Sequence, residues 1–301
     1  MGAVLIAGPY PQVSERLKDR RVFEAGQAGE LSEAERAEVR VIVVSGVQPL
    51  NAEAMDRYPN LGRIVALGAG YDGVDAAAAR ARGIEIVSGA GANADDVADM
   101  AVGLLIACAR GLFPNDARVR AGRWVRGQWE MVRSLSALKV GIVGLGHIGK
   151  AVADRLAPFR CEIAWNGPRP KPDVSLPYEP DILELARRSD VLILAAPLNA
   201  DTAGAVDARV IEALGPQGIL INVGRGGLVD EDALIAALKA GRLAGAGLDV
   251  FVEEPTPPSR WEGAPNVILQ PHTAAVTFEA LDNVYAVAAR NVTDFLDRQG
   301  R

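Results

Sequence analysis

The sequence predicts an α/β protein built from two doubly wound parallel-sheet domains, and two observations support this. Short, nearly continuous apolar runs recur along the chain, and each is followed by a turn and then by a helical pattern. Such runs are typical of parallel strands that are buried on both faces and connected by helices. The runs form two series, and a chain of 301 residues is long enough for two domains with separate cores.

The first series contains four strand-like runs and ends in a long apolar helix. The runs are AVLIAG at 3–8, VRVIVVSG at 39–46, GRIVALGAG at 62–70 and IEIVSGA at 84–90. A helical pattern from about Asp95 to Arg110 follows, and its apolar part is too short to span a bilayer. A polar connector with two tryptophans, Trp124 and Trp129, then separates the two series.

The second series contains six runs and is followed by one more helix. The runs are KVGIVG at 139–144, CEIAWN at 161–166, DVLILAAP at 190–197, GILINVG at 218–224, GAGLDVF at 245–251 and NVILQPH at 266–272. The stretch 277–298 has apolar residues at the spacing of an amphipathic helix. If this helix packs on the first domain, the chain crosses between the domains twice.

Charge and cysteine content narrow the choice of partner and compartment. The chain has 32 Lys and Arg against 38 Asp and Glu, a net charge of −6. Proteins of nucleic acid or membrane surfaces usually carry a basic excess, so we expect neither partner. The two cysteines have no metal-site or disulfide spacing, and we expect no metal. The N-terminus lacks the pattern of a signal peptide, so a cytoplasmic location is expected.

Three glycines stand where the run at 139–144 turns into a helical pattern. Gly144, Gly146 and Gly149 fit the spacing G-x-G-x-x-G between a strand and a helix. In a dinucleotide site, such glycines permit a tight turn, the approach of a pyrophosphate and close packing of the helix. The N-terminus of that helix also attracts phosphate. An ordinary tight turn is the alternative interpretation.

The end of the next strand bears on which dinucleotide is bound. A site for NAD usually carries an acid about 20 residues after the glycine turn. Here Asn166 ends the strand, Arg169 and Lys171 follow, and the first acid is Asp173. A neutral strand end followed by cations suits the 2′-phosphate of NADP, because Arg can bind phosphate with two hydrogen bonds. A solvated basic loop remains the alternative.

A histidine, a cation and an acid follow three different predicted strands. His272 comes after NVILQP, Arg225 after ILINVG and Glu254 after GLDVF. Open parallel sheets bind their ligands beyond the carboxyl ends of the strands, so the three side chains could converge there. The only other histidine, His147, lies in the glycine turn, where a solvent-facing side chain is the simpler interpretation.

Several motifs together resemble one enzyme family over nearly the whole chain. They are LGAGYDGVD, DDVADMAVGLL, VGIVGLGHIGKAVADRL, DVLILAAPLNADT, INVGRGGLVDEDAL, GLDVFVEEP and LQPHTA. The chain resembles the D-isomer-specific 2-hydroxyacid dehydrogenases, and most of all their NADP-linked glyoxylate/hydroxypyruvate and hydroxyphenylpyruvate reductases. The resemblance implies two Rossmann/flavodoxin-like domains with the active site in the cleft between them. It also implies a cofactor domain, 99–273, inserted into a substrate domain made of 1–98 plus 274–301.

The resemblance also implies a role for each of the three strand-end residues. Arg225 would hold the 2-oxo acid by its carbonyl and carboxylate, and His272 would protonate the carbonyl oxygen as hydride arrives. Glu254 would bond His272 and favour its protonated form. Asp249 matches the family's acid near the nicotinamide, although a capping role is the alternative.

The remaining site residues are carried over from the family's motifs in the same way. The substrate would contact Arg225, His272 and the stretch Leu67, Gly68, Ala69 and Gly70, whose last two backbone amides would receive its carboxylate. The cofactor, NADP with NAD possible, would contact Gly144, Gly146, His147, Ile148, Gly149, Asn166, Arg169, Ala196, Pro197, Thr202, Val223, Gly224, Arg225, Asp249 and His272.

Departures from the family's pattern leave the substrate and one other class of function open. Gly73 stands where the family often has Asn, and His272 is followed by Thr-Ala-Ala-Val-Thr in place of Ile-Gly-Ser-Ala-Thr. We expect reduction of a small 2-oxo acid to the D-2-hydroxy acid, with a bulkier aromatic 2-oxo acid as one alternative. A dinucleotide-sensing protein similar to transcriptional corepressors is the other. The apolar helix and the connector resemble family dimerisation structure, which predicts a homodimer, although simple core packing would explain the helix equally.

Overall fold

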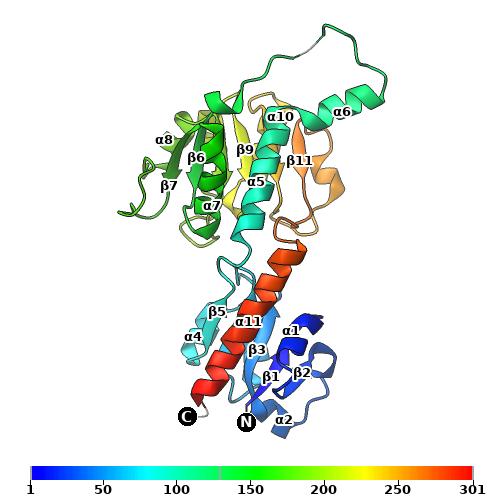
Figure 1. Cartoon of the computed structure of the whole chain (residues 1–301), viewed down its shortest axis with the longest axis vertical. Coiled ribbons are helices and arrows are strands. Elements are labelled where there is room, and N and C mark those ends of the chain that lie inside the picture. Colours follow the sequence, from blue (N-terminus) through cyan, green and yellow to red (C-terminus); the bar gives the residue numbers. More distant parts are fainter. Residues whose placement is uncertain (1, 129, 300–301) are drawn as a thin grey trace. The chain divides into compact units, whose positions relative to one another are not determined.

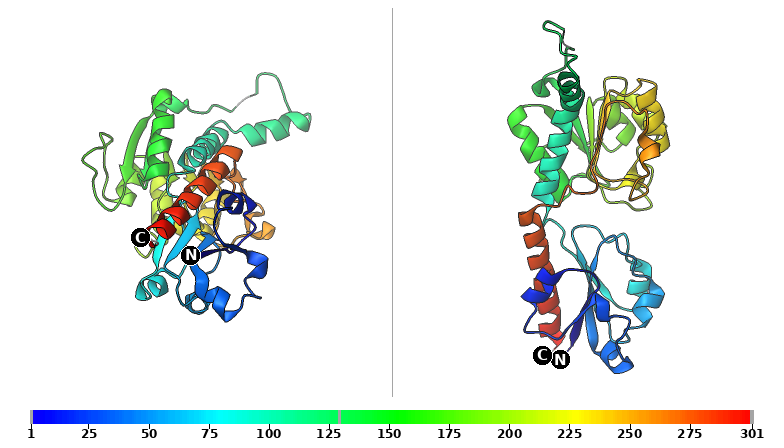
Figure 2. Two further views of the ribbon diagram at one scale, coloured as in Figure 1. Left: turned by 60° about the horizontal axis from the view of Figure 1, so that its bottom comes forward. Right: turned by 90° about the vertical axis from the view of Figure 1, so that its right-hand side faces the viewer.

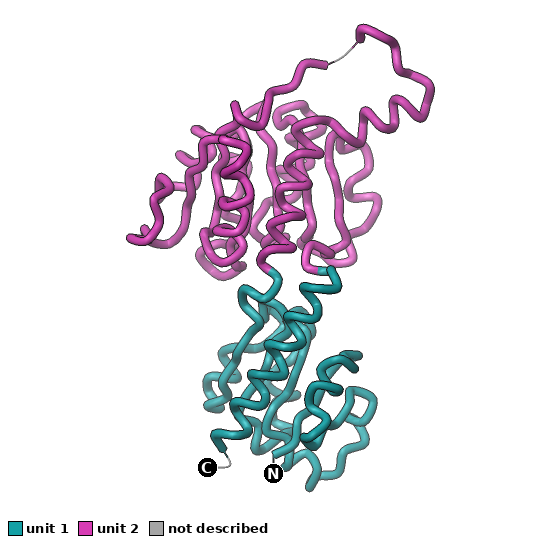
Figure 3. Tube along the Cα trace, viewed as in Figure 1, with its two compact units in different colours: residues 1–93, 276–301 teal, residues 94–275 magenta. Residues whose placement is uncertain are grey.

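The computed structural model describes residues 2–128 and 130–299, and the chain divides into two compact units. Unit 1 comprises Met1–Asn93 and Val276–Arg301, and unit 2 comprises Ala94–Ala275 (Figure 3). The chain passes from unit 1 to unit 2 after Asn93, five residues before the first predicted boundary. It returns to unit 1 after Ala275, two residues after the second predicted boundary. The first crossing lies immediately before a helix that begins at Ala94, so that whole helix belongs to unit 2.

Unit 1 is a five-stranded parallel sheet in the order β2-β1-β3-β4-β5 (Figure 1). Its strands are β1 (Ala3–Ile6), β2 (Val22–Glu24), β3 (Val39–Ser45), β4 (Arg63–Leu67) and β5 (Glu85–Ser88). Its helices are α1 (Pro11–Arg16), α2 (Glu33–Glu38), α3 (Ala52–Asp56), α4 (Ala76–Ala81) and α11 (Phe278–Gln299). Four strands match the predicted runs, whereas the three-residue strand β2 is too short to leave a pattern.

Two separate apolar clusters cover the two faces of the unit 1 sheet. Helices α1 and α11 pack on one face, where Val13, Val292 and Phe295 are buried against β1, β3 and β4. Figure 2 shows both helices on that side of the sheet. The opposite face is covered around Met55 and Ala79 of α3 and α4. The predicted C-terminal helix is therefore confirmed, and it packs on the first sheet.

Unit 2 is a six-stranded parallel sheet in the order β11-β10-β9-β8-β6-β7. Its strands are β6 (Lys139–Val143), β7 (Glu162–Asn166), β8 (Val191–Leu194), β9 (Ile219–Asn222), β10 (Gly245–Leu248) and β11 (Val267–Leu269). Its helices are α5 (Ala94–Ala109), α6 (Leu112–Arg120), α7 (His147–Leu156), α8 (Ile182–Arg187), α9 (Ala208–Leu214) and α10 (Glu231–Lys239). The predicted fold class, two doubly wound parallel sheets, is confirmed.

The strand order of unit 2 creates the point at which a ligand crevice is expected. The chain runs outward from β6 to β7 on one side and from β8 to β11 on the other, so the direction reverses between β6 and β8. Ligands of open α/β sheets bind beyond the carboxyl ends of the strands at such a point. Strands β8, β9 and β10 are fully buried, which explains why they read as continuous apolar runs.

Helix α5 carries the apolar stretch of unit 2, and its burial explains its composition. Val97, Leu104 and Leu105 of α5 are core residues, and the helix contacts α7, β9 and β10. Within the described residues, no single helix is long and apolar enough to cross a membrane, and α5 and α6 pass that test only when they are taken as a pair bent by 57°. The cytoplasmic location stays a prediction.

Candidate active site

Three neighbouring strands of unit 2 bring the predicted cation, acids and histidine to one edge of the sheet. Arg225 follows β9, Asp249 and Glu254 follow β10, and His272 follows β11. Because β9, β10 and β11 are adjacent and parallel, their carboxyl ends lie side by side. The loops after these strands therefore present their side chains on the same side of unit 2.

His272 and Glu254 form a close pair. The imidazole Nδ1 of His272 lies 2.6 Å from Glu254 Oε2. A carboxylate only accepts hydrogen bonds, so the proton of this bond is on Nδ1 and the outer nitrogen, Nε2, is the one left to exchange a proton with a ligand. The second oxygen of Glu254 accepts the backbone N–H of Phe251 at 3.0 Å, which fixes the carboxylate in place.

The backbone of His272 is held in the left-handed region by a buried acid. Its φ is +55°, an uncommon value for a residue with a side chain. Asp249 accepts the backbone N–H of Thr273 at 2.8 Å and that of Ala274 at 3.0 Å, immediately after the histidine. Burial raises the pKa of the Asp249 carboxyl, and the two N–H groups act in the opposite direction by favouring the carboxylate. Within unit 2, Asp249 thus holds the backbone beside His272.

Arg225 lies in a tightly packed turn that also reaches the loop of Glu254. The buried side chain of Asn222 donates to the Arg225 carbonyl at 2.9 Å and accepts the N–H of Gly224 at 3.1 Å. A Cβ on Gly226 would lie 1.8 Å from the carbonyl carbon of Phe251, so only glycine permits this approach. The half-buried guanidinium of Arg225 donates to the Gly224 carbonyl at 2.8 Å.

The glycine turn between β6 and α7 has close backbone contacts at two of its three glycines and open space at the third. Gly144 has φ +89°, and a Cβ there would lie 2.6 Å from Ala196 Cα. A Cβ on Gly149 would lie 2.0 Å from the Gly144 carbonyl oxygen, which explains the close packing of α7 on the turn. A Cβ on Gly146 would meet nothing within 4 Å, so the N-terminus of α7 faces open space. His147 begins α7 and is exposed, whereas Ile148 is half-buried.

The loops after β8 and β9 complete this edge of the sheet. Ala196 and Pro197 follow β8, and Thr202 Oγ1 donates to the Pro197 carbonyl at 2.7 Å. A Cβ on Gly224 would lie 2.8 Å from the Ala196 carbonyl oxygen, which brings the two loops together. Val223, which precedes Gly224, is buried. The cofactor residues predicted after β6, β8 and β9 thus lie along one side of unit 2.

Two polar side chains of the basic loop after β7 make hydrogen bonds within the chain. Asn166 ends β7, but its amide nitrogen donates to the carbonyls of Glu179 and Pro180 at 2.9 Å and 3.0 Å. Arg169 is exposed. Lys171 donates to the Leu145 carbonyl inside the glycine turn at 2.6 Å. The lysine therefore ties the loop to the turn, a contact that no pattern in the sequence indicated.

The predicted substrate stretch, Leu67–Gly70, begins at the last residue of β4 in unit 1. Gly68 has φ +82°, and Ala69 is exposed. A Cβ on Gly46 would lie 1.9 Å from the Gly70 carbonyl oxygen, so the loop after β3 packs closely against this stretch. Among the described residues, no group of three or more His, Cys, Asp or Glu side chains could hold a metal ion.

Comparison with known proteins identifies the family of this chain. The family description "D-isomer specific 2-hydroxyacid dehydrogenase, NAD binding domain" matches residues 102–274, which is more than half of the chain. The chain belongs to the D-isomer-specific 2-hydroxyacid dehydrogenase family. This family resemblance, predicted from the motifs, is confirmed, and the protein is an oxidoreductase with an NAD(P)-binding domain.

Individual family members resemble this dehydrogenase over most of its length. A glyoxylate/hydroxypyruvate reductase A of Arabidopsis thaliana is 38% identical over 268 residues, which covers 89% of this chain and 86% of that protein. A hydroxyphenylpyruvate reductase of Plectranthus scutellarioides is 40% identical over 241 residues, 80% of this chain and 78% of that protein. The solved structure of an NADPH-dependent glyoxylate/hydroxypyruvate reductase of Sinorhizobium meliloti, in complex with NADP and malonate, is 38% identical with a TM-score of 0.88. It covers 98% of this chain and 93% of that one.

Proposed function

We propose that this protein reduces a small 2-oxo acid of the glyoxylate or hydroxypyruvate type to the D-2-hydroxy acid, with NADPH as the favoured hydride donor. The observation that carries the proposal is the His272–Glu254 pair at 2.6 Å, which lies at the same sheet edge as Arg225 and the glycine turn. This combination supplies a proton donor, a cation for a carboxylate and a phosphate cradle.

The glycine turn fits the pyrophosphate of a dinucleotide. Open space over Gly146 and the N-terminus of α7, a helix of ten residues, offers backbone N–H groups to an anion. When bound, the nicotinamide cofactor supplies the hydride that reduces the substrate carbonyl carbon. The contacts of Ala196, Pro197, Thr202, Val223 and Gly224 with that cofactor are part of the proposal.

The residues of the chain then bind the substrate and deliver the proton. Arg225 binds the carboxylate and orients the carbonyl, since a guanidinium matches a carboxylate with two parallel hydrogen bonds. His272 donates the proton on Nε2 to the carbonyl oxygen, and Glu254 stabilises the protonated ring through Nδ1. The proton and the hydride together convert the 2-oxo acid into the 2-hydroxy acid.

A preference for NADPH is supported by the end of β7 and by one relative. Asn166 offers no carboxylate that would repel a 2′-phosphate, and the exposed Arg169 follows three residues later. The Sinorhizobium meliloti reductase is NADPH-dependent. Lys171 contributes by holding the loop against the glycine turn.

The assay that tests this proposal compares NADPH and NADH oxidation across glyoxylate, hydroxypyruvate, hydroxyphenylpyruvate and pyruvate. We expect the highest kcat/KM with NADPH as the cofactor and either glyoxylate or hydroxypyruvate as the substrate. Preference for hydroxyphenylpyruvate would move the substrate to the aromatic class, as the Plectranthus scutellarioides relative suggests. If the protein binds NADPH but reduces none of these acids, a dinucleotide-sensing function would replace the proposed reductase activity.

We also propose a homodimer formed by α6 and the connector that follows it. Seven large apolar side chains of this region are exposed: Leu112, Phe113, Val119, Trp124, Val125, Met131 and Val132. The second predicted tryptophan, Trp129, lies outside the described residues. An apolar surface of this kind is characteristic of protein–protein contact, and sedimentation at assay concentration tests it.

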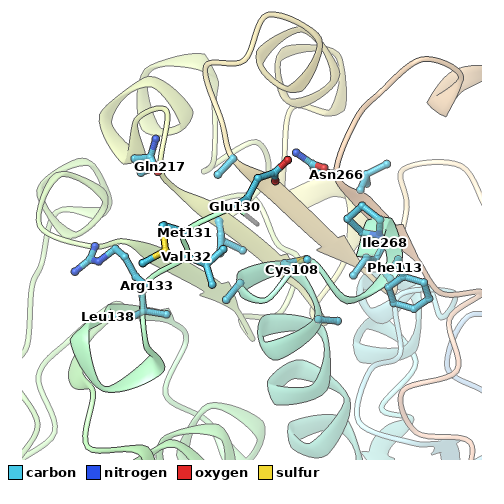
Figure 4. Close-up of a pocket in the computed structure, with 17 residues that line it drawn as sticks. Cys108, Phe113, Glu130, Met131, Val132, Arg133, Leu138, Gln217, Asn266 and Ile268 are labelled. Atoms are coloured by element: carbon cyan, nitrogen blue, oxygen red, sulfur yellow. The ribbon is translucent and has the colours of Figure 1, made fainter. Parts of the chain in front are cut away.

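A groove of about 540 Å³ beside this region supports the same proposal (Figure 4). Phe113, Met131 and Val132 line it together with Ile219 of β9 and Ile268 of β11. It lies at the amino ends of these strands, the opposite edge from His272. A second copy of the chain can therefore cover the groove on unit 2 and leave the proposed catalytic residues of that same unit 2 uncovered.

A further inference from the structure

Glu231, the first residue of α10, is a buried acid that the proposed mechanism does not use. Its residue exposure is 5%, although charged side chains are rarely buried unless their charge is paired. It lies six residues after Arg225 in the chain. Local sequence explains an acid in the first turn of a helix, but it does not explain the burial of that acid.

Both oxygens of Glu231 contact the segment 251–261, which carries Glu254. Oε1 accepts the backbone N–H of Val252 at 2.6 Å, and Oε2 accepts Nε of Arg260 at 2.7 Å. The carboxylate thus joins the two ends of this segment to α10. Within the segment, the rings of Phe251 and Trp261 lie 5.7 Å apart between centroids in an edge-to-face arrangement.

The backbone bond to Glu231 lies immediately beside the bond that fixes Glu254. Phe251 N–H goes to Glu254, and the next N–H in the chain, that of Val252, goes to Glu231. The side chain of Val252 is exposed, so it contributes little packing to this part of the loop. Two contacts therefore hold the loop backbone at this point, the close approach of Gly226 and the hydrogen bond to Glu231.

We propose that Glu231 is a positioning residue that holds the loop of Glu254 so that its carboxylate meets Nδ1 of His272. This inference rests on the proposed function. Without the bond to Val252, the backbone at Phe251 and Val252 can relax, and Glu254 loses its alignment with the imidazole. Proton delivery then weakens, while the glycine turn and Arg225 keep their own contacts.

The test compares three variants by kinetics. Glu231→Ala removes the acceptor for the Val252 N–H, whereas Glu231→Gln keeps an oxygen for that N–H and gives up the charge and the acceptor for Arg260. Asp232→Ala is the matched control, because Asp232 pairs with the same Arg260 at 3.1 Å but is exposed. Since general acid catalysis is typically worth about 10²–10⁴-fold, we expect Glu231→Ala to lose roughly 10- to 100-fold in kcat. The KM for the 2-oxo acid and the Kd for NADPH should stay close to their wild-type values, and the Gln variant and the control should retain most of kcat.

A second measurement reads the histidine directly. The chain has two histidines, so the imidazole ¹⁵N signals can be assigned with a His147→Gln variant. We expect His272 to carry its proton on Nδ1 in the neutral wild-type ring and to shift toward the Nε2-protonated form in Glu231→Ala. If Glu231→Ala does not fold, Glu231→Asp, which keeps the charge but shortens the reach, must show the same two changes.

The two readouts separate this inference from the proposed function. An unchanged ring signal and kcat in Glu231→Ala would overturn the positioning role, whatever the wild type reduces. Equal losses in the Ala and Gln variants would also overturn it, because the charge or the contact with Arg260, not the bond to Val252, would then matter. A wild type that reduces no 2-oxo acid but shows the expected ring signals would overturn the proposed function and leave the positioning role standing.

Discussion

Replacing Glu254 with glutamine should reverse the hydrogen bond to His272 without changing the shape of the site. Phe251 N–H needs an acceptor at 3.0 Å, so the glutamine oxygen takes that place and its NH₂ group faces Nδ1. Nδ1 must then accept a hydrogen bond, which only an unprotonated Nδ1 can do. The variant therefore disfavours the doubly protonated ring that delivers the proton.

The size of the effect follows from the geometry of this pair. A hydrogen bond to a charged group contributes about 1.5–3 kcal/mol. Both side chains keep about a third of their surface exposed, 36% for His272 and 33% for Glu254, so solvent screening places the contribution near the lower end. A loss of about 1.5 kcal/mol corresponds to roughly 10-fold in the reduction rate.

The assay is kcat/KM for reduction of glyoxylate or hydroxypyruvate from acid to alkaline pH. Glu253→Gln, the same change at the exposed neighbouring position, is the matched control and should behave as wild type. The rate of the Glu254→Gln variant should lie roughly 10-fold below that of the wild type. Superimposable profiles for wild type and Glu254→Gln would refute this role of Glu254.

Three other predictions test the cofactor loop, the close turn at Gly226 and the half-buried thiol of Cys108. Arg169→Ala should weaken NADPH by roughly 10- to 150-fold, as expected for one charge-assisted contact, and NADH far less. The exposed Arg209→Ala is its control, and equal losses for both cofactors in cofactor-binding titrations would contradict the role. Gly226→Ala places a Cβ 1.8 Å from the Phe251 carbonyl carbon, so urea unfolding should show a loss of about 1–3 kcal/mol or more, together with lower kcat. Gly103→Ala, where the Cβ meets nothing within 4 Å, should not destabilise, and equal stability of the two variants would contradict the argument. Burial raises the pKa of the Cys108 thiol to about 12. The unfolded thiol titrates near 8.5, so its contribution to stability is present below about pH 8.5 and is lost as pH rises toward 12, by up to about 2 kcal/mol at pH 10. The free energy of unfolding of Cys108→Ala should fall less between pH 8 and pH 10 than that of wild type, and identical losses would contradict this assignment.

The sequence by itself determined the two parallel sheets and the edge at which the chemistry gathers. A strand buried on both faces must be apolar throughout, and a tight turn under a helix must contain glycine, so both leave local marks. Because parallel strands share one direction, residues that follow β9, β10 and β11 must meet at one edge. Arg225, Glu254 and His272 could therefore be grouped before any distance was known.

Only the tertiary structure decided how these side chains are held. Lys171 reaches the Leu145 carbonyl and Glu231 reaches Val252 and Arg260, between residues more than 20 positions apart in the chain. An acid in the first turn of a helix looks the same in the sequence whether it faces water or a buried N–H group. Such contacts depend on how loops from different strands pack, and the local pattern of residue types carries no information about that packing.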